Sequence, residues 1–135
     1  MPIKITTLEN PQQIEAVVSG PDGANRLYVL TGIAPVGVAA SPGVTQTEIF
    51  TFLIGPTLTR QQFVKAIATA SLSFVNLNSL SLPVTGYWSV RSVDADWDDE
   101  SGQVEVRVEV QVSASVGGIF WVRGIGYQAT ILAQL

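Results

Sequence analysis

The stretch QVEVRVEVQV, residues 103–112, decides the fold class, because valine alternates in it with polar or charged residues without a break. Successive side chains of a β-strand point to opposite faces of the sheet, so this period of two is typical of a strand with one buried and one wet face. We therefore expect the five valines to face a core: Val104, Val106, Val108, Val110 and Val112.

The chain before this stretch predicts a second strand that pairs with it. If residues 99–102 form a loop, Trp97 lies opposite Val104 on the buried face, and Asp94 lies opposite Arg107 on the outer face. The apolar residues change parity between Trp88–Val90 and Val93–Trp97. Such a change indicates a β-bulge near residues 91–92.

One helix is expected, at about residues 60–76. Thr59 and Gln62 have the spacing of a capping box, which is an N-terminal signature of helices. Apolar residues then recur at spacings of four, three and four, as on one face of a helix. These residues are Phe63, Ile67, Ala70 and Phe74.

The remaining patterns predict strands at residues 3–8, 26–33 and 45–54, whereas residues 14–18 suit a strand or a short helix equally well. A β-meander is expected over residues 87–134. The fold class that follows is α+β, with about six mostly antiparallel strands packed on one main helix. The length is that of one domain, residues 1–135.

Residues 32–43, GIAPVGVAASPG, are apolar, uncharged and interrupted by two prolines, so we expect a loop there. A loop this apolar should not be left in contact with water on a monomer. It is either folded back over its own core or packed on a neighbouring subunit. The candidate interface residues are Ile33, Pro35, Val36, Val38 and Pro42.

Charge is scarce in this chain. Only 13% of its residues are charged, whereas about 25% is typical of soluble domains. Depletion of charge is a property of the buried centres of protein–protein interfaces, so we expect a homo-oligomer. The seven basic residues are scattered and the net charge is −4, which argues against nucleic acid as a partner. We expect no membrane span and no signal peptide, and therefore a cytoplasmic protein.

The sequence offers few side chains that are suited to catalysis, because it contains neither histidine nor cysteine. The most common general base, zinc ligand and thiol nucleophile are therefore missing. We expect a protein that is not an enzyme and has no cofactor.

Two groups of side chains could still bind a ligand. The acidic segment 94–105 has the carboxylate spacing of an EF-hand loop, but it lacks the required glycine and the flanking helices, so a solvated hairpin tip is the simpler interpretation. The candidate Ca²⁺ ligands are Asp94, Asp96, Asp98 and Glu105. A pocket for a small molecule or a carbohydrate could be lined by Trp88, Trp121 and Tyr127, although aromatic residues in strands are more often part of the core.

The leading hypothesis from the sequence is a structural protein without enzymatic activity that associates with itself into a ring, tube or particle. The alternatives are a small-molecule or carbohydrate-binding module that uses the aromatic residues, and a Ca²⁺-binding module that uses the acidic hairpin.

Overall fold

The computed structural model describes residues 1–21, 23–79 and 84–135, and within these ranges it contains strands and no helix. The α+β prediction is therefore wrong, and the fold is all-β. The predicted β-meander over residues 87–134 is wrong as well, because its last strand, Gly118–Gln134, lies in a different sheet from Gly86–Trp97 and Val104–Ala114. The strands are β1 (Ile3–Ile5), β2 (Glu9–Gly20), β3 (Gly23–Ala40), β4 (Thr45–Ile54), β5 (Phe63–Ser79), β6 (Gly86–Trp97), β7 (Val104–Ala114) and β8 (Gly118–Gln134).

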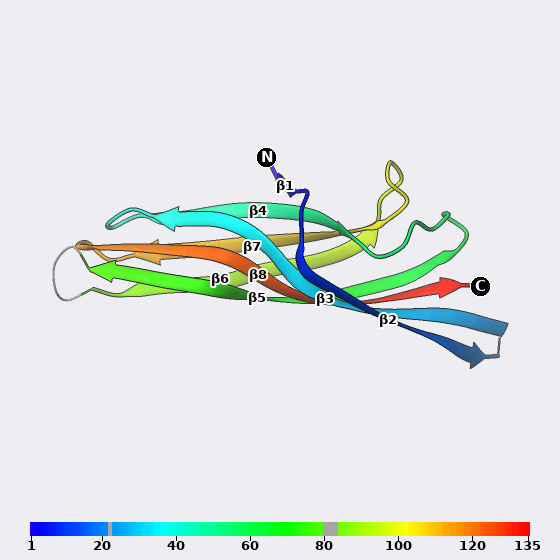
Figure 1. The fold of residues 1–135 in the computed structure, drawn as a ribbon. Coiled ribbons are helices and arrows are strands. Elements are labelled where there is room, and N and C mark those ends of the chain that lie inside the picture. Colours follow the sequence, from blue (N-terminus) through cyan, green and yellow to red (C-terminus); the bar gives the residue numbers. More distant parts are fainter. Residues whose placement is uncertain (22, 80–83) are drawn as a thin grey trace.

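The strands form two four-stranded sheets that pack face to face in a long, flat sandwich (Figure 1). The first sheet has the order β1-β4-β7-β6, and the second has the order β2-β3-β8-β5. Every neighbouring pair is antiparallel except β1 and β4, which are parallel. The hairpin of β2 and β3 projects at one end, past the strands of the first sheet (Figure 1).

The alternating valines of β7 form the centre of the core, as predicted, and none of the five is exposed to solvent. The predicted pairing of β6 with β7 is also confirmed, because Trp97 lies opposite Val104 and Asp94 opposite Arg107. The register shifts between Val90 and Ser92, which confirms the predicted bulge. Phenylalanines and alanines of the other strands complete the core.

The predicted helix over about residues 60–76 is wrong, because this segment is strand β5. The capping box itself forms: the Thr59 amide donates to Gln62 Oε1 at 2.9 Å, and the Gln62 amide donates to Thr59 Oγ1 at 3.2 Å. The turn ends at Phe63, whose amide donates to the carbonyl oxygen of Thr59. After it the chain pairs with β8 along its whole length, and no helix that could span a membrane occurs in the described residues.

The sequence of β5 contains both a helical spacing of apolar residues and a strand alternation of period two, and the structure follows the alternation. Small apolar residues at even positions from Ala66 to Leu72 pack against the core, while Lys65 to Ser71 at odd positions face outward. Long-range pairing with β8 extends from Phe63 to Ser79, and the β-branched side chains of the segment favour a strand. The capping box at Thr59 therefore forms a first turn, but a helix does not extend from it, because pairing with β8 is more favourable.

The expected loop over residues 32–43 is also wrong, because β3 continues to Ala40. Pro35 is tolerated in this central strand because it lies at a bulge: Pro35 pairs with Gly124 and Val38 with Val122, so two residues of β3 oppose one residue of β8. The bulge also alters parity in β8. Ile125, Tyr127 and Ile131 are buried as expected, but Trp121 faces outward.

Candidate assembly surface

The outer face of the second sheet carries rows of neutral side chains that run across all its strands. Residues that pair across an antiparallel sheet lie on the same face. One row contains Ile14, Val29, Thr130 and Ile67, and the next contains Ala16, Leu27, Leu132 and Lys65. The flanking rows contain Gln12, Thr31, Gln128 and Thr69 on one side and Val18, Asn25 and Gln134 on the other.

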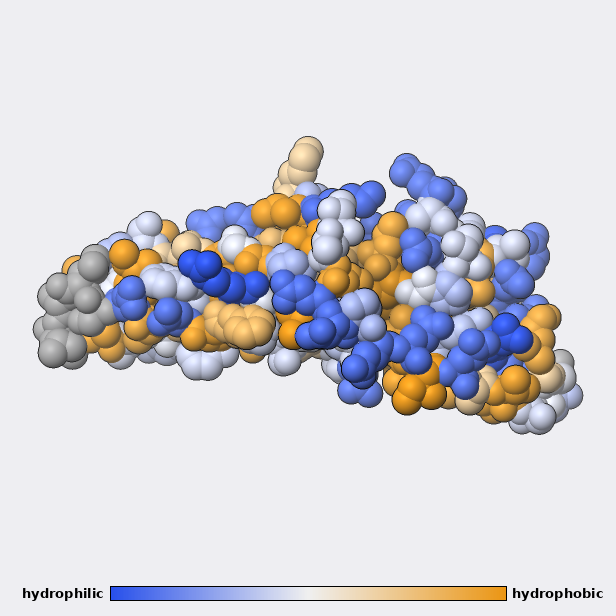
Figure 2. All heavy atoms as spheres, viewed as in Figure 1, coloured by the Kyte–Doolittle hydropathy of each residue, from blue (hydrophilic) through white to orange (hydrophobic). Residues whose placement is uncertain are grey.

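The apolar members of these rows form what we call the outer band: Ile14, Ala16, Val18, Leu27, Val29, Ile67 and Leu132. Large aliphatic side chains in it are open to water, since Ile14 is 70% exposed and Ile67 is 59% exposed. Figure 2 shows apolar side chains at the surface of the end where the β2–β3 hairpin projects. Contiguous exposed apolar surface of this kind marks sites of protein–protein contact.

The outer band has almost no charge. Among the residues of its rows and the flanking rows, Lys65 is the one charged side chain. The charges of the hairpin lie on its other face, where Arg26 Nε is 3.0 Å from Glu15 Oε1. A neutral, apolar centre with charges around it is the anatomy of a protein interface.

β2 is exposed along its entire length, on both faces. Among the strands that the structure describes it contacts β3 alone, so its second edge has no neighbour. An exposed edge strand presents a row of free N–H and C=O groups on which another strand can pair. In this protein the free edge is continuous with the outer band.

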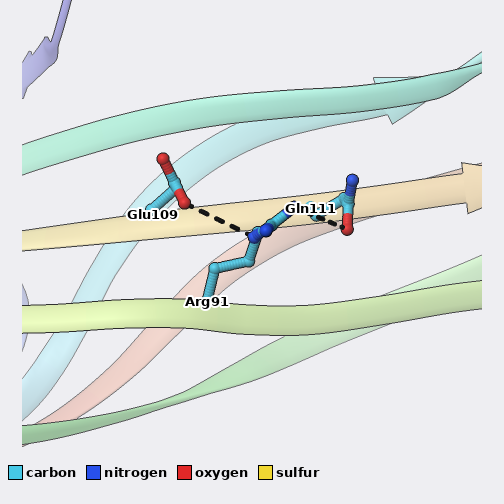
Figure 3. A network of polar contacts seen from close by, with 3 residues as sticks. All are labelled: Arg91, Glu109 and Gln111. Carbon is cyan, nitrogen blue, oxygen red and sulfur yellow. Dashed lines mark hydrogen bonds and ion pairs between the residues drawn. The ribbon is translucent and has the colours of Figure 1, made fainter.

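The outer face of the first sheet is different, because it is polar and charged. Asp94 pairs with Arg107 and Asp96 with Glu105 across β6 and β7. Further along, Arg91 Nε lies 3.5 Å from Glu109 Oε2, and a terminal nitrogen of Arg91 donates to Gln111 at 3.4 Å (Figure 3). Exposed ion pairs of this kind contribute little to stability, but they keep a surface hydrated.

The five candidate interface residues from residues 32–43 lie in different environments. Ile33 and Pro35 are half-buried on the outer face of the second sheet. Val36 lines an open groove of about 640 Å³ beside Trp121 and Arg123. Val38 is only 2% exposed and belongs to the core, and Pro42 lies exposed in the turn after β3.

The four candidate Ca²⁺ ligands lie at the β6–β7 hairpin. Asp94, Asp96 and Glu105 share the outer face of the first sheet. Asp98 instead organises the turn, because its Oδ2 accepts hydrogen bonds from the Ser101 hydroxyl at 2.6 Å and from the Ser101 amide at 3.0 Å. These bonds lower the pKa of the Asp98 carboxyl. No group of three or more potential metal ligands is found in the described ranges.

The three candidate aromatic residues line separate hollows. Trp88 is 54% exposed and stacks on Phe120, with ring centroids 5.5 Å apart. Trp121 lies on the outer face of the second sheet, with the Arg123 guanidinium 6.0 Å from its ring. Tyr127 is buried against Phe52, and this burial raises the pKa of its phenol.

The sequence alone does not reveal the outer band or the free edge of β2. The stretch IEAVV at residues 14–18 is apolar on both parities, which does not distinguish a helix from a strand. Its neighbours on the sheet come from residues 25–29, 65–67 and 130–132, so the band becomes visible only when the register is known. No protein family, curated protein or solved structure matches this chain.

Proposed function

We propose that this chain is a structural protein that associates with copies of itself, and that the outer band of the second sheet is the contact surface. The observation that carries the proposal is the exposure of Ile14 and Ile67 within an apolar band that spans four strands and whose rows contain one charged side chain, Lys65. Covering such a surface with a second copy removes it from water, with a gain of about 25 cal/mol for each Å² of apolar area.

The shape of the molecule supports this role. A long, flat sandwich presents extended faces and a projecting hairpin, which offer contact area (Figure 1). Closed rings and open filaments are both built from repeated contacts of this kind between identical subunits. The proposal includes no catalysis and no cofactor, and it places the assembly in the cytoplasm.

The test compares two lysine substitutions that are matched in position and exposure. Ile67→Lys places a charge in the outer band, whereas Thr47→Lys places it on the exposed outer face of the first sheet. Because an unpaired charge in an interface is costly to desolvate, Ile67→Lys should weaken association at least about 30-fold, the equivalent of about 2 kcal/mol. Sedimentation velocity measures the change in mass.

Thr47→Lys should leave the mass unchanged. Equal dissociation by both variants, or no dissociation by Ile67→Lys, would show that the outer band is not the contact. Circular dichroism of both variants establishes that each keeps the strand content of the unmodified chain.

A further inference from the structure

We propose that β2 pairs with β2 of a second copy, antiparallel and about a two-fold axis at Ala16, so that the two second sheets join into one continuous sheet. This inference rests on the proposed self-association and specifies one of its contacts. Three features of the hairpin carry it: the direction of the free backbone groups, the length of the free edge and the distribution of side chains.

The first feature is which residues of β2 point their backbone groups outward. Gly20 pairs with Gly23 across a two-residue connection, and the residues that flank such a connection normally share a hydrogen bond. Hydrogen-bonded and non-hydrogen-bonded pairs alternate along an antiparallel ladder. Ile14, Ala16 and Val18 therefore bond to β3, and the odd-numbered residues from Gln13 to Ser19 direct their N–H and C=O groups away from it.

The second feature is where the free edge begins and ends. Pro11 has no N–H, Asn10 has a positive φ of 49°, and the register with β3 shifts between Glu9 and Gln12. At the other end the strand stops at Gly20. The regular edge is therefore Gln12–Gly20, which is about 30 Å long and has Ala16 at its centre.

The third feature is that the edge is complementary to itself. With Ala16 opposite Ala16 of the partner subunit, Ile14 lies opposite the partner's Val18 on the outer face, and Glu15 lies opposite the partner's Val17 on the other face. All the outward N–H and C=O groups then find partners, with Gln13 opposite the partner's Ser19. No like charges are brought into direct opposition, which would be unfavourable.

The charges near this junction balance. Each copy contributes Glu15 and Arg26, whose side chains are already paired at 3.0 Å. Val17 is opposite Arg26 in its own hairpin, so the row that contains Glu15 of one copy also contains Arg26 of the other. The junction is neutral, and the outer bands of the two copies form one uninterrupted surface.

The other sheet edges are less suitable for pairing. β1 is only three residues long, and β5 and β6, which are edge strands of the two sheets, contact each other, whereas within the described residues β2 contacts β3 alone. Short or covered edges are the usual protection against strand addition. β2 has neither protection.

Single cysteines test the register, since the chain contains no other cysteine. A non-hydrogen-bonded pair has a Cα–Cα distance of about 4.5 Å, which a disulfide can bridge. Ala16→Cys should therefore be oxidised to a disulfide-linked dimer, whereas Ile14→Cys should not, because the two copies of residue 14 would be about 13 Å apart. Non-reducing gel electrophoresis after mild oxidation measures the yield.

A mixture provides the matched control. Ile14→Cys and Val18→Cys should each remain unlinked alone, but should link to each other when the two variants are mixed before oxidation. All three positions are exposed on the hairpin, so the substitutions leave the core intact. Equal yields from Ala16→Cys and Ile14→Cys in a chain that sediments as an oligomer would overturn the β2 pairing and leave self-association standing. A monomeric chain would overturn both.

Discussion

The two outer faces of this sandwich differ although the inner faces behind them are alike. β7 has valines on its inner face and Glu105, Arg107 and Glu109 on its outer face, so the outer side of the first sheet is suited to water. β8 and its neighbours have an equally apolar inner side, but their outer side carries Ile14 and Ile67 in the open.

This difference shows how a chain with few charges uses them. Most of the carboxylates lie on the first sheet and at its hairpin tip, where they keep one face hydrated. The second sheet is left neutral over the outer band. The low charge content of the chain therefore does not make its whole surface neutral. The few charges are unevenly distributed between the two outer faces.

The largest effect is expected from a charge on the inner side of β7. Val106→Asp places a carboxylate at a position with no solvent exposure, which should destabilise the fold by at least about 4 kcal/mol. The neighbouring change Arg107→Gln, on the wet face, should cost less than about 1 kcal/mol. Urea denaturation measures both, and similar losses would mean that β7 does not separate a buried face from a wet one.

Two proline substitutions distinguish the free edge of β2 from the edge that bonds to β3. Val18→Pro removes an N–H that bonds to β3 and should destabilise the hairpin by about 3 kcal/mol. Val17→Pro removes an outward N–H, so it should weaken association while leaving the hydrogen-exchange protection of β3 unchanged. Loss of that protection in Val17→Pro would contradict the assignment of the outward groups.

Substitutions of two glycines of β3 compare the effect of an added methyl group at a crowded position with its effect at an open one. A methyl group at Gly32 would collide with the ring of Tyr127, so Gly32→Ala should destabilise the fold by about 1–3 kcal/mol. Gly37→Ala is the control, because a methyl group there meets nothing. Thermal unfolding compares them, and a Gly32→Ala variant as stable as Gly37→Ala would show that Tyr127 does not lie over β3.

The smallest effect concerns the acidic hairpin tip. The pKa of Asp98 is lowered in the folded chain by its hydrogen bonds with Ser101. Its contribution to stability is therefore present above the pKa of an unfolded aspartate, about 3.9, and is lost as the pH falls through the lower folded value. Asp98→Asn should flatten the acid limb of a plot of stability against pH, and an unchanged acid limb would exclude this role.

The parts of the fold that could be predicted are those governed by local alternation. The register of β6 on β7 follows from parity and from the turn at residues 99–102, whose hydrogen bond from the Asp98 amide to the Gln103 carbonyl closes the hairpin. The helix was mispredicted for the opposite reason, because the capping box at Thr59 is a real local interaction that long-range pairing with β8 overrides.

The outer band was beyond prediction for a related reason. The apolar segment 32–43 is the interface that the sequence predicts, but Pro35 marks a bulge within β3 and Val38 is part of the core. The outer band instead combines residues from four strands that are distant in sequence. Its existence depends on register, which hydrophobic periodicity in single segments does not specify.

The most direct test of the central claim is the mass of the unmodified chain in solution, measured by light scattering from micromolar to millimolar concentration. If the outer band is a contact between copies, the mass must reach at least twice the 14.4 kDa of one chain within this range. A constant mass of 14.4 kDa over the whole range would contradict it.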